Sequence, residues 1–344
     1  TPYIIGAGGV NITTSSSGQL TVSASAGASS AVTQAGGSTI NDVSTFVFTG
    51  STVTDIRFPI PFDTTFGLGM EAMPFSTIKV TQVQTSYTRE IYPTVDPNQQ
   101  GGQEENVGRV GRHVSTPLRH IDRQDNRWYC GNQLLGEGIF LHLDPSKHTD
   151  QKDIFNSSES EDLEEWRSIH ENFLGRVREA RHSYDETPED ERDQEDLQRL
   201  DAMELEAMSL NPIFVWWHSF AHEFINQLSV DSGFMTVSLG ERVYCVRKDN
   251  GSYSAGLFIY ACSPGTDGTL GGLTSLVDGN VLPRIVERTM ERIRTCSSDP
   301  PCSARRINSS KRNGAACHVC LMNPETSCSY RNMFLDRNVV RQTM

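Results

Sequence analysis

The chain has 344 residues and a formal net charge of −13 at pH 7, with 43 acidic side chains against 30 lysines and arginines. This length is enough to bury a substantial core, and it predicts two or three structural units. No apolar run reaches the length of a membrane-spanning helix, which excludes a protein anchored by such helices. No secretory signal opens the sequence, so we expect a cytoplasmic protein.

The negative charge is concentrated in one part of the chain. Residues 157–206 hold eighteen acidic and six basic side chains, whereas residues 284–344 hold eleven basic and five acidic side chains. A basic C-terminal unit therefore follows a strongly acidic insert, and the net charge alone does not exclude contact with DNA.

The N-terminal segment, residues 1–43, is rich in glycine, serine and threonine and has no charged side chain before Asp42. Alternating stretches at 10–13 and 20–23 are typical of short strands, but a disordered linker accounts for the composition as well. Residues 44–150 predict a β-rich domain. Its strand at 136–143 contains Glu137 and His142, which are either catalytic residues or the polar residues of a half-buried strand.

Residues 151–209 predict an acidic helical insert or linker. Apolar residues recur every three or four positions between 160 and 181, which indicates one amphipathic helix. Residues 184–206 are either a mobile acidic linker or the polar start of another helix. Their dense carboxylates lack the spacing of a calcium loop, so a solvated face is the expected role.

A second helix is predicted at 213–228, after Pro212, and it is apolar nearly all round, so we expect it to be central and buried. His218 and His222 lie on one face of this helix, and Glu223 is adjacent. A zinc protease would carry its glutamate between the two histidines. The pair is therefore either a metal site or two histidines that are hydrogen-bonded within the core.

Two strands, 237–244 and 255–262, form a predicted hairpin, and a glycine-rich stretch, 263–273, follows them. Such a stretch is either a tight structural turn or a contact to phosphate. The phosphate-loop sequence G-x-x-x-x-G-K-[ST] occurs nowhere in the chain. We therefore expect no ATP hydrolysis by this chain.

An arginine-rich amphipathic helix is predicted at 283–294, and the loop after it adds further cations. Guanidinium groups suit phosphate by geometry as well as by charge, so these residues predict a track along the DNA backbone. The alternatives are a solvated face or pairing with the acidic insert. The predicted nucleic-acid-binding residues are Arg284, Arg288, Arg292, Arg305, Arg306, Lys311 and Arg312.

Five of the eight cysteines lie between residues 296 and 328. Structural zinc takes four tetrahedral ligands, and a Cys-x-x-Cys pair supplies two of them from one turn. We expect one zinc per chain, although a disulfide framework or unpaired thiols are alternatives. Cys296 ends the preceding helical pattern and is kept as a substitute ligand. The predicted ligands are Cys302, Cys317, Cys320 and Cys328.

Several runs resemble the zinc-binding MZB domain that closes certain DNA helicases, and their order and spacing are most similar to the DrmB-type proteins of the DISARM anti-phage system. The resemblance extends from about residue 75 to the end of the chain. It implies a zinc-binding partner subunit of a DNA helicase. The runs are YTRE (87–90), WYCGNQLLGEGIFL (128–141), WWHSFAHEFI (216–225), GERVY (240–244), LFIYACSPGTDGTLGGL (257–273), CSSDPPC (296–302) and GAACHVCLMNPETSCSYRNMFLDR (314–337).

The expected fold is α+β, with antiparallel sheet elements upstream and a mixed α/β zinc-binding domain at 210–344. The expected function is that of a non-catalytic accessory subunit in antiviral defence, which binds a DNA helicase subunit and the DNA backbone through a structural zinc domain, away from any membrane. The alternative is a metal-dependent hydrolase or nuclease that uses His218, His222 and Glu223, or Asp267.

Overall fold

The computed structural model describes most of the second half of the chain and parts of the first, with strand bounds alone for segments elsewhere. None of the helices in the described part combines the length and the apolar character that crossing a membrane requires. The described ranges are 69–83, 131–143, 148, 150–155, 160–188, 192, 194–248, 250–261, 272–278, 281–307, 312–324 and 326–343.

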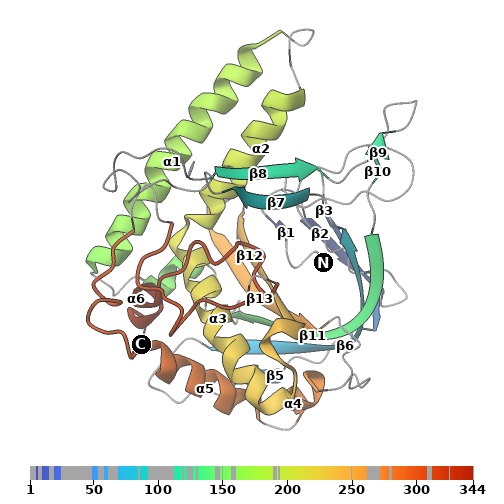
Figure 1. The fold of residues 1–344 in the computed structure, drawn as a ribbon, viewed down its shortest axis with the longest axis vertical. Helices are drawn as coiled ribbons and strands as arrows, with labels where there is room; N and C mark the ends of the chain where they lie inside the picture. Colours follow the sequence, from blue (N-terminus) through green and yellow to red (C-terminus); the bar gives the residue numbers. More distant parts are fainter. Residues whose placement is uncertain are drawn as a thin grey trace, which may run out of the picture.

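A five-stranded antiparallel sheet lies at the centre of the molecule, with the strand order β12-β13-β11-β6-β5 (Figure 1). Its strands are β5 (Phe58–Ile60), β6 (Met70–Val83), β11 (Gly131–Leu143), β12 (Leu239–Arg247) and β13 (Tyr253–Ala261). Ile259 on β13 pairs with Ile139 on one side and with Glu241 on the other. Strands from the predicted units 44–150 and 210–344 therefore share one sheet, and the α+β fold class is confirmed.

One face of this sheet is the core face. On β13, Leu257 and Ile259 point into it and are fully buried. On β12 the corresponding residues are Leu239 and Val243, and Glu241 lies between them with the same two-residue period. Alternation along the strand thus directs the carboxylate of Glu241 into the core, where it is fully buried.

Helix α3 (Pro212–Ser232) covers that core face. It begins where the side-chain oxygen of Asn211 accepts a 2.9 Å bond from the backbone N–H of Ile213, and it ends at Gly233, whose φ of +77° favours glycine. Its residues contact β12 and β13, and on other sides α5 (Leu282–Ile293) and α6 (Arg337–Arg341). The predicted central buried helix is confirmed.

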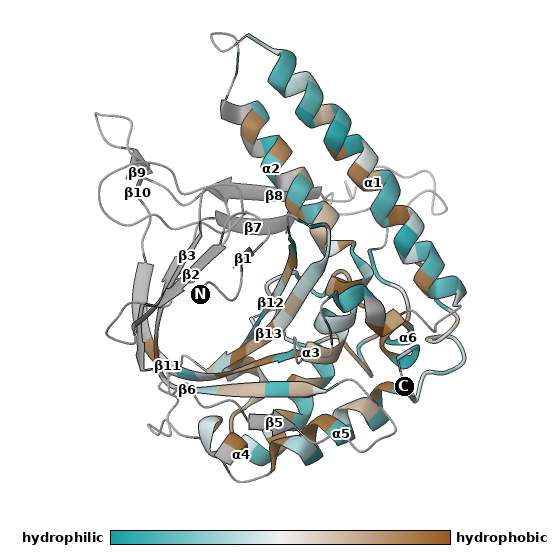
Figure 2. Ribbon diagram, turned by 180° about the vertical axis from the view of Figure 1, so that it is seen from behind, coloured by the Kyte–Doolittle hydropathy of each residue, from teal (hydrophilic) through white to brown (hydrophobic). Residues whose placement is uncertain are grey.

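Helices α1 (Glu161–Glu186) and α2 (Gln194–Ser209) pack on each other and project from the body of the molecule (Figure 1). The buried residues of α1 include Leu163, Trp166 and Phe173, as its apolar periodicity predicts. The rest of α1 is largely hydrophilic (Figure 2). The sequence left residues 184–206 open as linker or helix, and from Gln194 onward they are helical.

Glu137 has a structural role in this fold. Its buried carboxylate accepts hydrogen bonds from the backbone N–H of Leu273 (3.1 Å) and of Thr274 (3.4 Å), where helix α4 (Thr274–Asp278) begins. His142 lies 3.4 Å from the carboxylate of Glu71 on the neighbouring strand. The interpretation of both residues as polar members of a half-buried strand is thus favoured over catalysis.

Shorter elements complete the fold, and two strands coincide with the stretches predicted at 10–13 and 20–23. A four-stranded sheet contains β1 (Ile5–Gly6), β2 (Val10–Thr14), β3 (Gln19–Ala24) and β4 (Thr49–Thr52). Two strand pairs are β7 (Ser86–Ile91) with β8 (Arg112–Pro117), and β9 (His120–Ile121) with β10 (Arg127–Trp128). The 3-10 helices are η1 (Gln151–Phe155) and η2 (Thr236–Ser238).

Residues 331–336 do not form a helix. Arg331, Asn332 and Phe334 have φ values of +55°, +56° and +62°, and a left-handed backbone cannot continue a right-handed helix. Helix α6 instead begins at Arg337, where the carboxylate of Asp336 accepts a 2.9 Å bond from the backbone N–H of Asn338. The glycine-rich loop at 263–271, which contains Asp267, lies outside the described residues, and so does Lys311.

Candidate metal centre

Four thiols converge in the loops that follow α5. The sulfur atoms of Cys296, Cys302, Cys317 and Cys320 lie within 4.8 Å of one another, and all four cysteines are free. The separations are 3.6 Å for Cys296–Cys317 and Cys317–Cys320, and 3.8 Å for Cys302–Cys320. A disulfide requires about 2.05 Å, whereas a tetrahedron with Zn–S bonds of about 2.3 Å has edges of about 3.8 Å. The donor set therefore fits zinc.

The Cys317–Cys320 turn is built by its own backbone. The carbonyl of Cys317 accepts bonds of 3.1 Å from the N–H groups of Cys320, Leu321 and Met322, and the N–H of Cys317 donates to the sulfur of Cys320 at 3.3 Å. Burial opposes ionisation of Cys317, but the backbone N–H of Val319 and the neighbouring thiols lower its pKa to about 6. The turn thus holds two sulfurs side by side and stabilises a thiolate, the form that binds metal.

Residues 315–323, which contain the Cys317–Cys320 turn, are called the knuckle below. The other two cysteines lie in the turn between α5 and the knuckle, and a buried arginine holds that turn. The backbone N–H of Cys296 donates to Asp299 at 3.0 Å, and Asp299 is ion-paired with Arg337. Arg337 is fully buried and also donates to the carbonyl of Arg294 at 3.2 Å, at the end of α5. Helix α6 therefore fixes the position of Cys296 and of Cys302, whose pKa burial raises to about 11.

The structure groups three of the four predicted ligands with a different fourth cysteine. Cys302, Cys317 and Cys320 lie together, but the fourth member of their group is Cys296, which the sequence offered only as a substitute. Helix α5 ends at Ile293, so Cys296 lies beyond the helix and turns toward the knuckle. Cys328 belongs to a different group.

Cys328 lies with the histidine pair of α3. The Nε2 atom of His218 is 3.4 Å from the sulfur of Cys328 and 2.8 Å from Oε1 of Glu241, and His222 Nε2 is 3.2 Å from the same oxygen. All four residues are buried. Burial lowers the pKa of His218, which favours a neutral ring.

The glutamate of this group differs from the one that the sequence singled out. Glu223 accepts a 2.7 Å bond from the side chain of Gln227 and lies 3.8 Å from Arg292. Burial raises its pKa. Glu241 was missed, although its position between Leu239 and Val243 in an alternating strand could have indicated a core-facing carboxylate.

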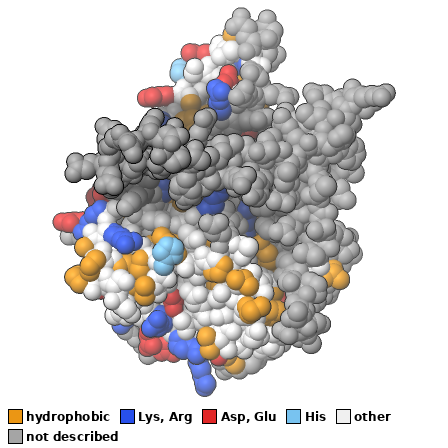
Figure 3. Space-filling view, in the orientation of Figure 1, with side chains coloured by type: hydrophobic (Ala, Val, Ile, Leu, Met, Phe, Trp, Pro, Cys, Tyr) orange, Lys and Arg blue, Asp and Glu red, His pale blue; other side chains and the backbone are white. Residues whose placement is uncertain are grey.

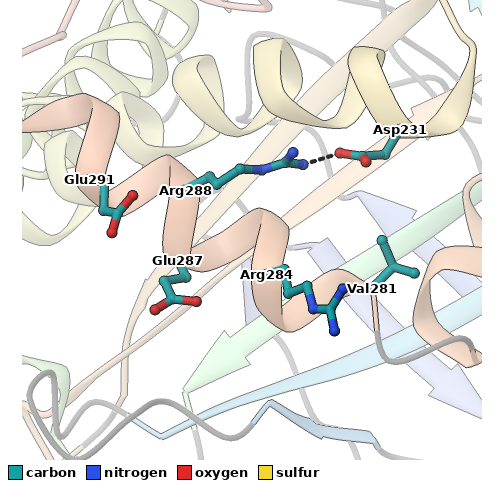
Figure 4. Close-up of a pocket in the computed structure, with 6 residues that line it drawn as sticks. All are labelled: Asp231, Val281, Arg284, Glu287, Arg288 and Glu291. Carbon is teal, nitrogen blue, oxygen red and sulfur yellow. Dashed lines mark hydrogen bonds and ion pairs between the residues drawn. The ribbon is translucent and has the colours of Figure 1, made fainter.

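Four of the seven residues of the predicted basic track are ion-paired with acidic side chains, namely Arg288, Arg292, Arg306 and Arg312. On α5, Arg288 is ion-paired with Asp231, and both line a hollow beside that helix (Figure 4). The hollow presents three carboxylates against two guanidinium groups, which disfavours an anion there. Its lining residues are Asp231, Val281, Arg284, Glu287, Arg288 and Glu291.

The loop arginines contact the acidic helices. Arg306 lies 2.5 Å from Asp162 and 3.6 Å from Glu161 at the start of α1, and Arg312 is ion-paired with Glu206 near the end of α2. Arg305 instead donates to a backbone carbonyl of the knuckle, at 2.8 Å. At the lower edge of Figure 3, Lys and Arg side chains likewise lie beside Asp and Glu side chains.

Comparison with known proteins supports the zinc assignment. Residues 220–321 match the family described as the MrfA Zn-binding domain (MZB), and this range contains the four clustered cysteines. The DISARM protein DrmB of Bacillus paralicheniformis (strain ATCC 9945a / NCIMB 11709 / CD-2) is 36% identical over 133 residues. That match covers 38% of this chain and 23% of the relative's length. The predicted resemblance to MZB domains and to DrmB is confirmed, and the chain carries a zinc-binding domain.

Proposed function

We propose that this chain is a non-catalytic accessory subunit, or part of one, that acts with a DNA helicase in anti-phage defence. The observation that carries the proposal is the similarity to the DISARM protein DrmB around the zinc domain. In this proposal Cys296, Cys302, Cys317 and Cys320 hold a structural zinc. Bound zinc would tie the turn after α5 to the knuckle, and so hold the surface that meets the partner and the DNA backbone.

Burial of the histidine cluster supports a non-catalytic role. Catalytic zinc sites keep one position open to water or substrate, whereas the side chains of His218, His222 and Glu241 are 0% exposed. Glu223, which the hydrolase alternative would use with the two histidines, is engaged with Gln227 outside the cluster. The sequence also lacks the phosphate-loop motif. The hydrolase alternative therefore has less support.

The ion pairs of Arg306 and Arg312 support a DNA contact that the acidic helices regulate. Both arginines are partly exposed, at 44% and 30%, and their partners belong to α1 and α2. The side chains of Glu161 and Glu206 are themselves exposed or partly exposed, and such ion pairs contribute only about 0–1 kcal/mol, so DNA phosphate can displace these two carboxylates. In this proposal α1 and α2 compete with DNA for the two arginines.

The helicase part of the proposal is tested by reconstitution. The purified chain is mixed with a DISARM helicase, complex formation is measured by size-exclusion chromatography, and ATP turnover is measured with and without DNA. We expect a complex, no turnover by the chain alone, and a rise in the ATPase activity or DNA affinity of the helicase. Turnover by the isolated chain, or the absence of a complex, contradicts the proposal.

The DNA part is tested by fluorescence anisotropy with duplex DNA over a range of salt concentrations. Each phosphate contact contributes about −0.9 to the slope of log affinity against log salt. Arg306→Ala with Arg312→Ala should weaken binding and flatten the slope, and Arg288→Ala with Arg292→Ala tests the α5 residues in the same way.

Two variants test whether the acidic helices regulate DNA binding: Glu206→Gln is the test and Glu204→Gln is its control. Glu206 contacts Arg312, whereas Glu204 pairs with Arg181 inside the α1–α2 hairpin. We expect Glu206→Gln to tighten DNA binding and Glu204→Gln to leave it unchanged. Equal affinities and slopes in all these variants would show that this face does not touch DNA.

A further inference from the structure

The histidine cluster (His218, His222, Glu241 and Cys328) places hydrogen-bond acceptors against one another. The Nε2 atoms of His218 and His222 are only 3.1 Å apart, and both point at Oε1 of Glu241. Each ring places its other nitrogen on a backbone carbonyl, Nδ1 of His218 on Phe334 (3.3 Å) and Nδ1 of His222 on Leu321 (2.5 Å). A carbonyl only accepts, so each Nδ1 carries a proton and donates it. In the neutral rings, both Nε2 lone pairs then face the carboxylate oxygen.

Protons alone do not satisfy this arrangement. One proton placed among the three acceptors can bridge two of them, but the third lone pair still faces an acceptor. A second proton would make both rings imidazolium cations with their Nε2 atoms 3.1 Å apart in a buried site, which is costly. The other oxygen of Glu241, Oε2, is buried and has no hydrogen-bond partner, and a buried carboxylate without a compensating cation is costly. A divalent cation at the centre would accept both Nε2 lone pairs and Oε1, and would compensate the charge of the buried carboxylate.

The fourth group, Cys328, supplies a sulfur atom that backbone N–H groups contact. Its sulfur accepts hydrogen bonds of 3.3 Å from the backbone N–H groups of Tyr330 and Asn332 and lies 3.4 Å from Nε2 of His218. Such N–H donors stabilise negative charge on the sulfur. The cluster therefore offers two imidazole nitrogens, one carboxylate oxygen and one thiolate.

We propose that His218, His222, Glu241 and Cys328 form a second metal site of the chain, occupied by structural zinc. Mixed nitrogen, sulfur and oxygen donors suit zinc. With Zn–N bonds of about 2.0–2.1 Å, tetrahedral nitrogens lie about 3.3 Å apart, close to the 3.1 Å between the two histidines. The carbonyls on Nδ1 are the outer partners that orient metal-bound imidazoles.

The second site joins three elements that are distant in sequence. Its ligands come from α3, from β12 and from the loop before α6, and four protein ligands in a buried position leave no place for substrate. Leu321, whose carbonyl accepts from His222, directly follows the zinc ligand Cys320. The side chain of Asn323 also donates to the carbonyl of His222 at 2.9 Å. The second metal thus anchors the knuckle of the first site to the central helix.

Metal content and sulfur ligation of the unsubstituted chain test the proposal without any mutation. Elemental analysis of purified, folded protein should give about two zinc ions per chain. X-ray absorption at the zinc edge should show a mixture of sulfur and nitrogen or oxygen ligands, because five thiolates are shared by two ions. One zinc per chain with sulfur ligands alone would overturn the second site.

Two matched pairs of variants assign the second ion to these residues. Glu241→Gln and Cys328→Ala should each lose about half of the bound zinc. Their controls are Glu223→Gln, a buried carboxylate outside the cluster, and Cys245→Ala, a buried free cysteine outside both clusters; both should retain all of it. If Glu241→Gln and Cys328→Ala fold and keep the full zinc content, the assignment is wrong. If they fail to fold, the metal content and absorption spectrum of the unsubstituted chain decide.

Discussion

The two candidate metal clusters of this chain are built in opposite ways. The four cysteines lie between residues 296 and 320, in two turns that have backbone hydrogen bonds of their own and that Arg337 of α6 supports at Asp299, and Cys296 and Cys320 are partly exposed. The second cluster joins a helix, a strand and a loop, with His218 and Cys328 separated by 110 positions, and it is wholly buried. The first can be assembled locally around a metal, whereas the second forms only when α3, β12 and the last loop have come together.

Asp336 contacts residues that lie next to each of the two clusters. Its backbone N–H donates to the side chain of Ser219 on α3 at 2.8 Å, next to His218. Its buried carboxylate accepts from the backbone N–H of Ala315 at 3.1 Å and from the indole N–H of Trp166 at 2.9 Å. The knuckle, the central helix and α1 are therefore connected through one residue, and damage to one cluster should reach the other.

The largest expected effect is the loss of the local cluster. Cys317→Ser with Cys320→Ser removes two thiolates, and structural zinc contributes about 10–16 kcal/mol of binding free energy in zinc-finger peptides. We expect residues 296–343 to unfold, with loss of zinc by elemental analysis and rapid proteolysis of that segment. Cys245→Ala is the control. A stable, protease-resistant double variant would show that metal does not hold this region.

The next effect concerns the buried cluster. His218→Ala removes a ligand and leaves the carboxylate of Glu241 without its closest partner, which should cost about 3–5 kcal/mol of unfolding free energy. The matched control is His170→Ala, another buried histidine, which bonds the carbonyl of Ala207 at 2.8 Å outside both clusters. Its loss should cost about 1–3 kcal/mol. Chemical denaturation measures both, and equal costs would contradict a special role for His218.

A third effect is the pH dependence that Asp336 contributes. Burial raises its pKa to about 6, whereas an aspartate in the unfolded chain has a pKa of about 3.9. Between these values the folded protein holds a proton that the unfolded chain releases, so the stability contributed by Asp336 decreases as pH rises from about 4 to about 6. Its full size is about 3 kcal/mol.

Asp336→Asn isolates this contribution, because protonation of the zinc ligands affects both proteins alike. The free energy of unfolding is measured from pH 4 to 7, and the difference between the two proteins is plotted against pH. We expect the unsubstituted chain to lose stability relative to Asp336→Asn as pH rises. A difference that does not change with pH would show that Asp336 is ionised throughout.

The smallest effect is expected at the ion pairs of the surface. Arg312→Ala breaks the pair with Glu206, and exposed pairs of this kind contribute about 0–1 kcal/mol. Its unfolding transition should therefore match that of the unsubstituted chain, whatever its effect on DNA. A loss of more than about 2 kcal/mol would place Arg312 among the structural contacts of the zinc domain.

Features that depend on local spacing could be predicted from the amino-acid sequence. The three- and four-residue periodicity of α1, the apolar surface of α3 after Pro212, and the Cys317–Cys320 turn were all readable, because helix faces and tight turns involve neighbours in the chain. A resemblance carried by short runs also identified the zinc domain and the relative to which this chain is similar.

Which distant groups meet depends on how the helices and strands pack, and the sequence did not predict it. Cys296 rather than Cys328 completes the four-cysteine cluster because α5 ends early enough for the chain to turn back. Glu241 rather than Glu223 joins the histidines because strand alternation and the packing of α3 on β12 direct its carboxylate into the core. Arg306 and Arg312 are paired because α1 and α2 fold beside them. Such contacts depend on how elements pack, and spacing along one segment does not encode the position of another.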